Sequence, residues 1–253
     1  MSALHETSAL LSSVRHGFFG RAGGASTGVY AGNNVSFTTG DDSNIVAANR
    51  AGIAAAMDYD AADLLILKQT HSAHVHVVTE RLSADTVIEA DAMVTDRPGL
   101  LLGIMTADCT PILFADIEAG IIGAAHAGWR GAVDGICEAT ITSMVALGAQ
   151  TNRIVAVIGP TISGPNYEVG PQFAAQLLAL RPAAGNRVST PEGGSEHFDL
   201  PGFVADGLTE AGIQTIDRVG GCTYAEPTRY FSHRYATHHQ IKTGRQLAVI
   251  GLT

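Results

Sequence analysis

Three short apolar runs lie close together in the middle of this 253-residue chain, at residues 100–105, 112–115 and 121–125. Gly, Pro and Asp stand at or near their ends, so none of the runs reaches the length of an ordinary helix. Runs of this length with such boundaries are typical of buried β-strands. The sequence therefore predicts a β-sheet at the centre of the fold.

Residues that can bind metals or take part in catalysis lie at the ends of these predicted strands. Cys109 follows the first run, His126 follows the third, and Trp129, the only tryptophan, lies just beyond. A further candidate, His71, follows another apolar run at residues 64–67. Because strands form a rigid scaffold, side chains at their ends can be held together in space. We expect His71, Cys109 and His126 to form the functional centre.

The remaining pattern predicts an α+β fold with mixed β-sheets and flanking helices. Helices are expected at about 44–57, 132–147, 171–180 and 201–211, and further strands at 64–67, 74–78, 154–158 and 246–252. Strands outnumber helices and several are not separated by helices, which disfavours a doubly wound fold. No linker or internal repeat is visible, and the length allows one well-filled core. We expect a single domain over residues 1–253, with its core at about 15–250.

Composition and charge exclude several classes of protein. A net charge of -9 and a pI near 5.5 leave no basic patch for nucleic acid, although a local pocket for a small anion is still allowed. The apolar runs are far shorter than the roughly 18 residues of a membrane span, and no signal peptide is visible. Three cysteines fit free thiols in a reducing compartment. We expect a cytoplasmic protein, and the sequence does not indicate its oligomeric state.

Two segments near the N-terminus are candidates for anion binding. The glycine-rich segment 15–34 contains Gly24 and Ser26, whose backbone can form a nest for phosphate or carboxylate. It matches no phosphate-binding motif, and a glycine-rich turn is the plainer interpretation. Arg50 lies in the predicted helix 44–57. Its side chain is either a ligand for an anion or an ordinary solvated arginine. Cys137, on the apolar stripe of the helix 132–147, is expected to be a small buried hydrophobe.

The central residues allow two kinds of chemistry. One cysteine and two histidines are ligands that suit Zn²⁺, and three protein ligands leave a fourth position open. Their spacing fits no zinc finger, so a buried cysteine with two unrelated histidines is an alternative. Without metal, Cys109 as thiolate and His126 as its base would make a cysteine hydrolase. Asp108 is a candidate general base or an orienting group.

A copper oxidase is disfavoured by the histidine pattern. A multicopper enzyme needs many paired histidines, whereas this chain has one His-x-His pair, at 74 and 76, and one His-His pair, at 238 and 239. It also lacks a separate Cys-His cluster for an electron-transfer copper.

A series of motifs in a fixed order resembles the YfiH-like family, also called the laccase-domain or multicopper polyphenol oxidase family. The motifs are Gly-Gly-x-Ser-x-Gly-x-Tyr (23–30), Asn-Arg (49–50), Lys-Gln-Thr-His-Ser (68–72), Asp-Ala-Met-Val-Thr (91–95), Thr-Ala-Asp-Cys (106–109), His-Ala-Gly-Trp-Arg-Gly (126–131), Ile-Gly-Pro (158–160), Tyr-Glu-Val-Gly (167–170), Cys-Thr (222–223), Phe-Ser-His-Arg (231–234) and Thr-Gly-Arg (243–245). Each motif is short, but together they extend from about residue 15 to 250.

The resemblance implies an α+β domain, shared with the deamidase domain of a bacterial toxin, with zinc held by His71, Cys109 and His126. It implies phosphorolysis of adenosine, inosine, guanosine or methylthioadenosine to base and ribose 1-phosphate, together with adenosine deamination. The family has also been assigned an amidase role, removing L-serine from a cell-wall precursor, and it carries an older copper-laccase label.

Physical chemistry is compatible with the nucleoside activities. Zinc lowers the pKa of water, which can then attack the purine C6 and release ammonia. Phosphorolysis needs cationic and backbone donors around the phosphate. The candidates are Arg50, Arg130, the loop holding Gly24 and Ser26, and, less strongly, Lys68. We expect small-molecule substrates, a purine nucleoside and phosphate.

Overall fold

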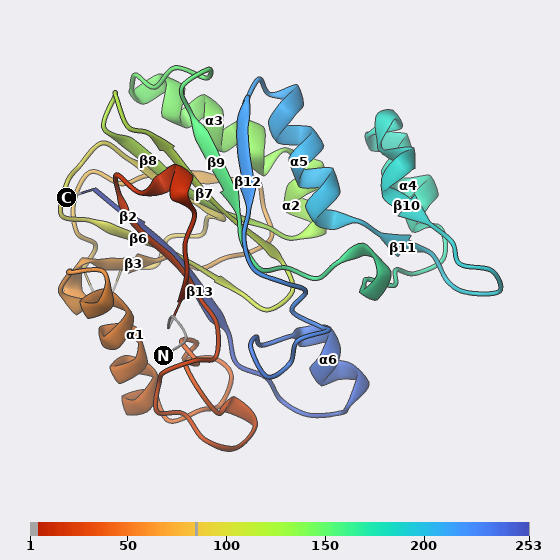
Figure 1. The fold of residues 1–253 in the computed structure, drawn as a ribbon, viewed down its shortest axis with the longest axis horizontal. Helices are drawn as coiled ribbons and strands as arrows, with labels where there is room; N and C mark the ends of the chain where they lie inside the picture. Colours follow the sequence, from red (N-terminus) through yellow and green to blue (C-terminus); the bar gives the residue numbers. More distant parts are fainter. Residues whose placement is uncertain (1–4, 84–85, 253) are drawn as a thin grey trace.

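The computed structural model describes residues 5–83 and 86–252, and in it two β-sheets pack face to face between outer layers of helices (Figure 1). The five-stranded sheet has the order β1-β2-β13-β6-β3. Its strands are β1 (His5–Glu6), β2 (Arg15–Phe19), β13 (Gln246–Gly251), β6 (Leu101–Thr106) and β3 (Leu64–Ile66). All neighbours in it are antiparallel except β3 and β6, which run parallel.

The six-stranded sheet has the order β12-β9-β7-β8-β5-β4. Its strands are β12 (Thr215–Arg218), β9 (Val155–Ile158), β7 (Thr110–Asp116), β8 (Ile121–Ala127), β5 (Ala92–Thr95) and β4 (Val75–Val77). The pairs at both edges are parallel and the inner pairs are antiparallel. A separate hairpin joins β10 (Val188–Ser189) and β11 (His197–Phe198). Both large sheets are therefore of mixed or nearly antiparallel type.

Alternation along the strands creates the buried layers. Successive side chains of a strand point to opposite faces of its sheet. In β13, Ala248 and Ile250 join the cluster between the two sheets, whereas Leu247 and Val249 pack in the cluster beneath the helix α1. Both faces of this strand are buried, which explains why its sequence is a continuous apolar run rather than an alternating one.

Helices cover the outer face of each sheet. The helix α1 (Ser43–Ala56) packs on the five-stranded sheet. It is capped by Asp42, whose side chain accepts hydrogen bonds from the backbone N–H groups of Asn44 and Ile45. The six-stranded sheet is covered by α2 (Trp129–Asp134), α3 (Ile136–Leu147), α4 (Phe173–Leu180) and α5 (Leu200–Glu210), and α6 (His233–His238) follows near the C-terminal end. Short 3₁₀ turns complete the chain: η1 (Ala9–Leu11), η2 (Gly28–Tyr30), η3 (Ala61–Asp63), η4 (Gly164–Asn166) and η5 (Pro182–Arg187).

The α+β architecture with mixed sheets and flanking helices confirms the expected fold class. One expected helix differs: the stretch 132–147 forms two helices, because Gly135 adopts a left-handed φ of 94° that ends α2 and begins α3. The helix α2 also begins earlier than expected, at Trp129. In the described parts of the chain, every helix is too short or too polar to traverse a lipid bilayer.

Candidate metal centre and adjoining clefts

Three side chains singled out in the sequence meet at one place. The ligand atoms of His71, Cys109 and His126 all lie within 4.8 Å of one another. The Cys109 Sγ is 3.8 Å from His71 Nε2, and the two imidazole rings stand edge to face with centroids 4.9 Å apart. Within residues 5–83 and 86–252, this is the only group of three or more His, Cys, Asp or Glu side chains close enough to bind a metal ion.

Each of the three residues comes from a different segment. His126 lies in β8, Cys109 lies in the short link from β6 to β7, and His71 lies in the loop after β3. The strands β3 and β6 belong to the five-stranded sheet, whereas β7 and β8 belong to the six-stranded sheet. The centre therefore joins the two sheets, and strand ends hold it.

A buried carboxylate that sequence reasoning left without a role organises the centre. Asp91 is 0% exposed and accepts a 2.8 Å hydrogen bond from His126 Nδ1. The same carboxylate accepts from the backbone N–H groups of Thr70, His71 and Ser72, and from the Ser72 hydroxyl. It thus fixes the His71 loop and directs Nε2 of His126 toward the centre, as carboxylates beside metal-binding histidines do.

The backbone around the centre is unusually close-packed. A Cβ atom on Gly128 would lie 2.6 Å from Cδ2 of His71 and 3.2 Å from the Cys109 Sγ, so only glycine leaves room for both ligands. His71 itself has a φ of 62°, a left-handed conformation that few residues with side chains adopt. Such strain persists where surrounding contacts enforce it, and here the Asp91 carboxylate does so.

The protonation of Cys109 and His126 is coupled. Burial raises the pKa of the Cys109 thiol, but His126 and His71 outweigh this and bring it down to about 6. Burial lowers the pKa of His126, but Cys109 and Asp91 outweigh this and raise it to about 9. Thiolate is the form in which cysteine binds metals and acts as a nucleophile. The donor set, one thiolate and two imidazoles, fits a borderline-soft ion such as Zn²⁺.

Asp108 lies beside Cys109, and its carboxylate is already engaged. One oxygen accepts from the Thr223 hydroxyl at 2.7 Å, and the other accepts from the backbone N–H of Arg234 at 2.6 Å. Its own carbonyl accepts from the Ile162 N–H. These contacts tie the link between β6 and β7 to the start of α6. Of the two roles expected for Asp108, this geometry favours orientation over general base.

A large cleft opens on one side of the centre. It has a volume of about 640 Å³ and is lined by His71, Cys109 and His126 together with the basic residues Arg50, Lys68 and Arg245. We call it the cation cleft. Arg50 and Lys68 were expected here as phosphate ligands, whereas Arg245 belongs to a motif of the sequence that had been given no role.

The two arginines of the cation cleft are half-buried and lack acidic partners within the described residues. Arg50 donates to the carbonyl of Val35 and stacks on the ring of Phe37, with its Cζ 4.3 Å from the ring centroid. Burial lowers the pKa of Arg50 to about 10 and also lowers that of Arg245. Lys68, by contrast, is exposed and pairs with Glu89 at 2.7 Å.

A smaller cleft also borders the centre. It has a volume of about 270 Å³ and is lined by His71 and Cys109 together with Trp129 and Tyr167. We call it the aromatic cleft. Arg130, which was expected to bind phosphate, lies at this cleft and places its Cζ 5.1 Å from the Trp129 ring centroid.

Gly24 and Ser26 line neither cleft. Ser26 is buried, donates its hydroxyl to Asp41 at 2.7 Å and accepts from the side chain of Asn49. The backbone N–H of Ala25 donates to the same Asn49. These donors and acceptors serve the loop itself, so the geometry favours the glycine-rich turn over the phosphate nest.

Known proteins are similar to this chain over most of its length. Residues 15–253 match the family model described as "Multi-copper polyphenol oxidoreductase laccase". The chain belongs to this family. A relative named "Purine nucleoside phosphorylase" from Deinococcus radiodurans is 45% identical over 94% of this chain and 89% of its own. "Purine nucleoside phosphorylase ORF3" from Streptomyces griseus is 38% identical over 92% of this chain and 94% of its own.

Solved structures of this laccase-like family share the fold. The Bacillus licheniformis protein YfiH superposes with a TM-score of 0.87 at 31% identity, covering 96% of this chain and 94% of its own. YlmD from Geobacillus stearothermophilus gives 0.86 at 28% identity, covering 98% of each chain. The expected resemblance to the YfiH-like family is therefore confirmed.

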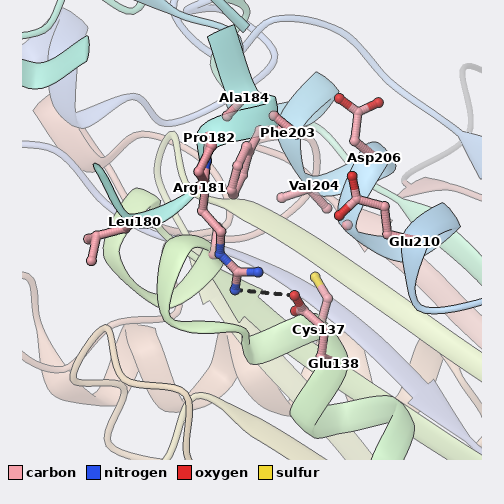
Figure 2. Close-up of a pocket in the computed structure, with 13 residues that line it drawn as sticks. Cys137, Glu138, Leu180, Arg181, Pro182, Ala184, Phe203, Val204, Asp206 and Glu210 are labelled. Atoms are coloured by element: carbon pink, nitrogen blue, oxygen red, sulfur yellow. Dashed lines mark ion pairs between the residues drawn. The ribbon is translucent and has the colours of Figure 1, made fainter. Parts of the chain in front are cut away.

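A further pocket of this family member shares no lining residue with the two clefts (Figure 2). It has a volume of about 290 Å³, lies between α3, α5 and the segment from α4 to η5, and contains none of the predicted site residues. Arg181 and Glu138 form an ion pair across it at 3.2 Å. Cys137 is 3% exposed and burial raises its thiol pKa, as expected for a small hydrophobe in the core.

Proposed function

We propose that this protein is a metal-dependent purine nucleoside phosphorylase whose centre is formed by His71, Cys109 and His126. The observation that carries the proposal is that residues of this centre line both a cleft with two arginines that lack acidic partners and a cleft lined by aromatic rings. The names of the relatives support the reaction class. We propose adenosine, inosine, guanosine and methylthioadenosine as substrates.

Arg50 and Arg245 are the residues we assign to phosphate. A guanidinium held away from water with no carboxylate partner gains most from an anion that accepts its hydrogen bonds. In the reaction, a phosphate oxygen forms a bond to C1′ while the bond from C1′ to the purine breaks. The electron pair leaves with the purine, and the proton of hydrogen phosphate balances its charge. Lys68, already paired with Glu89, adds positive charge at the rim.

Zn²⁺ is the ion we propose for the centre, because the thiolate and two imidazoles fit it and leave a fourth position open. When bound, it supplies a Lewis acid and lowers the pKa of water. Asp91 holds His126 in the tautomer that presents Nε2 to the ion. The open position is also the reason for proposing adenosine deamination as a second activity of the same site.

The free thiols support a cytoplasmic location for these reactions. Cys109, Cys137 and Cys222 are all unpaired in the structure. Free thiols persist in reducing compartments. The proposed substrates are small molecules.

A metal-free cysteine hydrolase is the second candidate, and one observation favours it. In space, Cys109, His126 and Asp91 are arranged as a nucleophile, its base and a carboxylate that orients the base. The lowered pKa of Cys109 and the raised pKa of His126 also suit a thiolate nucleophile. This candidate predicts activity that chelators leave intact, whereas the metal enzyme loses activity on chelation.

Product analysis tests the proposal. Purified protein loaded with zinc is incubated with adenosine, with and without phosphate, beside the variants Cys109→Ala and Cys137→Ala. We expect adenine only when phosphate is present, inosine in both tubes, and neither product from Cys109→Ala. The matched Cys137→Ala variant should keep the activity, because Cys137 lies in the core away from the centre.

Other results would contradict the proposal in recognisable ways. Equal turnover by Cys109→Ala would mean that another site or a contaminant makes the product. Activity that persists after chelation would favour the cysteine hydrolase. No product from any nucleoside would direct the search to the amidase activity, with an L-serine-containing cell-wall precursor as substrate.

A further inference from the structure

The two clefts meet at a shared boundary. Both are lined by His71, Ala107, Cys109 and His233. A ligand whose centre lies against these residues can therefore extend one end into each cleft. A nucleoside undergoing phosphorolysis has this form at the moment of reaction, since C1′ lies between the purine and the phosphate.

We propose that the purine base binds in the aromatic cleft against Trp129 and Tyr167, while phosphate binds in the cation cleft, so that C1′ lies at the shared boundary. This assignment rests on the proposed phosphorolysis for its substrate, but its central claim is the location of base binding. It also assigns Arg130 to the base side, in place of the phosphate role expected from the sequence.

The aromatic cleft is built to receive a flat, apolar ring with polar edges. Its floor includes Ile162 and Leu200, each 1% exposed. The Trp129 ring is held edge to face against Phe173 at 5.3 Å between centroids, which fixes one wall. Rings fixed in this way offer π surface at little cost in conformational entropy. Base-on-aromatic contacts are a common way to bind purines.

Tyr167 adds a directional contact. In the described parts of the chain its hydroxyl makes no hydrogen bond with the protein, although the side chain is half-buried. Burial raises the pKa of Tyr167, so the hydroxyl keeps its proton and can donate. The guanidinium of Arg234 lies over the same ring, with its Cζ 5.4 Å from the centroid. A purine ring nitrogen or carbonyl is an acceptor suited to these donors.

The cation cleft suits the other half of the reaction. It holds the guanidinium of Arg50, which lies over the Phe37 ring, and that of Arg245. Burial lowers the pKa of both Arg50 and Arg245, whereas the side chain of Arg130 is exposed to solvent. The cations with the most to gain from an anion therefore lie in the cation cleft.

The chain supplies its own probe, because Trp129 is its only tryptophan. Zinc-loaded protein is titrated with adenine, with adenosine and, separately, with inorganic phosphate, while tryptophan emission is recorded. Free N-acetyltryptophanamide at equal absorbance corrects for light absorbed by the base. We expect adenine and adenosine to quench the emission saturably and phosphate alone to leave it unchanged.

Two variants locate the contacts. Tyr167→Phe should weaken adenine binding about fivefold, the effect of losing one hydrogen bond. Tyr224→Phe should not, because Tyr224 is a half-buried tyrosine that bonds His238 and lines neither cleft. Arg245→Gln should raise the KM for phosphate about tenfold or more, as expected for a lost charged hydrogen bond, and leave adenine quenching intact.

The outcomes separate this inference from the proposed function. Quenching by phosphate and not by adenine would reverse the assignment, and quenching by neither would overturn it. If adenine quenches Trp129 but no phosphorolysis occurs, the base site stands and the proposed reaction fails. If phosphorolysis occurs without quenching, the reaction stands and the base lies elsewhere.

Discussion

At the level of single residues, the sequence reveals the metal-binding candidates but not the residues that orient them. His71, Cys109 and His126 are recognisable because each follows an apolar run that forms a strand. Asp91 is equally central, yet its position just before a strand is also typical of an ordinary turn. Its partners lie 20 and 35 positions away, at His71 and His126. Only the folded chain brings them together, and the same holds for Arg245.

Replacing Asp91 by Asn should loosen metal binding. The amide keeps the size of the side chain but removes the charge and half of the acceptor capacity that fixes His126 and the His71 loop. We expect zinc affinity to fall about 10- to 100-fold, measured by competition with a chromophoric chelator. Glu89→Gln, at an exposed acid outside this network, is the control. Equal zinc affinity in the Asp91 variant would show that the carboxylate is dispensable.

At the level of helices and strands, periodicity predicts most elements within a few residues. The helix capped by Asp42 and the final strand ending at Gly251 are examples. The break between α2 and α3 escaped prediction because the apolar stripe continues across Gly135, while the φ of 94° there depends on tertiary packing. That break sets α2 apart as a short element carrying Trp129 and Arg130 to the aromatic cleft.

Gly128, at the start of α2, should tolerate no side chain. An added methyl group would meet His71 and the Cys109 Sγ, so Gly128→Ala should reduce bound zinc and abolish turnover. Gly207→Ala provides a matched control, because a Cβ there meets nothing within 4 Å and Gly207 lies in α5. The control should keep zinc and gain up to about 1 kcal/mol in stability. Metal analysis and thermal unfolding measure both effects, and normal zinc content in Gly128→Ala would refute the steric argument.

Asp116, at the end of β7, should make the free energy of unfolding depend on pH. Burial raises the pKa of Asp116, but hydrogen bonds from Gln150 and Arg153 outweigh it and hold the pKa below its ordinary value. A lowered folded-state pKa adds stability above the unfolded pKa that is lost as pH falls. Asp116→Asn should therefore cost about 1–3 kcal/mol at pH 7 and less near pH 3, measured by urea unfolding. A cost that is the same at both pH values would contradict this.

At the level of the whole molecule, alternation and strand count are enough to predict an α+β fold, but not the pairing of its strands. The four layers depend on contacts between distant segments, such as β2 with β13 and β3 with β6. Periodicity describes which face of a strand is buried without saying which strand lies beside it. The two facing sheets, and the centre between them, therefore emerge only from the structure.

Metal binding should stabilise the whole fold, because the ligands come from both sheets. A ligand present at 100 times its Kd adds about 2.7 kcal/mol, which corresponds to roughly 5–10 °C in Tm for a chain of this size. Calorimetry of zinc-loaded and chelated protein measures the shift. Cys109→Ala should show little or no shift with zinc. A large shift in that variant would indicate that zinc binds elsewhere.

The position of β13 has a consequence for how the protein is made. This strand, the last among residues 5–83 and 86–252, lies between β2 and β6 in the middle of the five-stranded sheet. Its partners are synthesised long before it and have no central neighbour until the ribosome releases residues 246–251. Pairings between such distant segments form slowly. The sheet that positions the link carrying Cys109 therefore closes only after residues 246–251 have been synthesised, so His71, Cys109 and His126 are brought together late in folding.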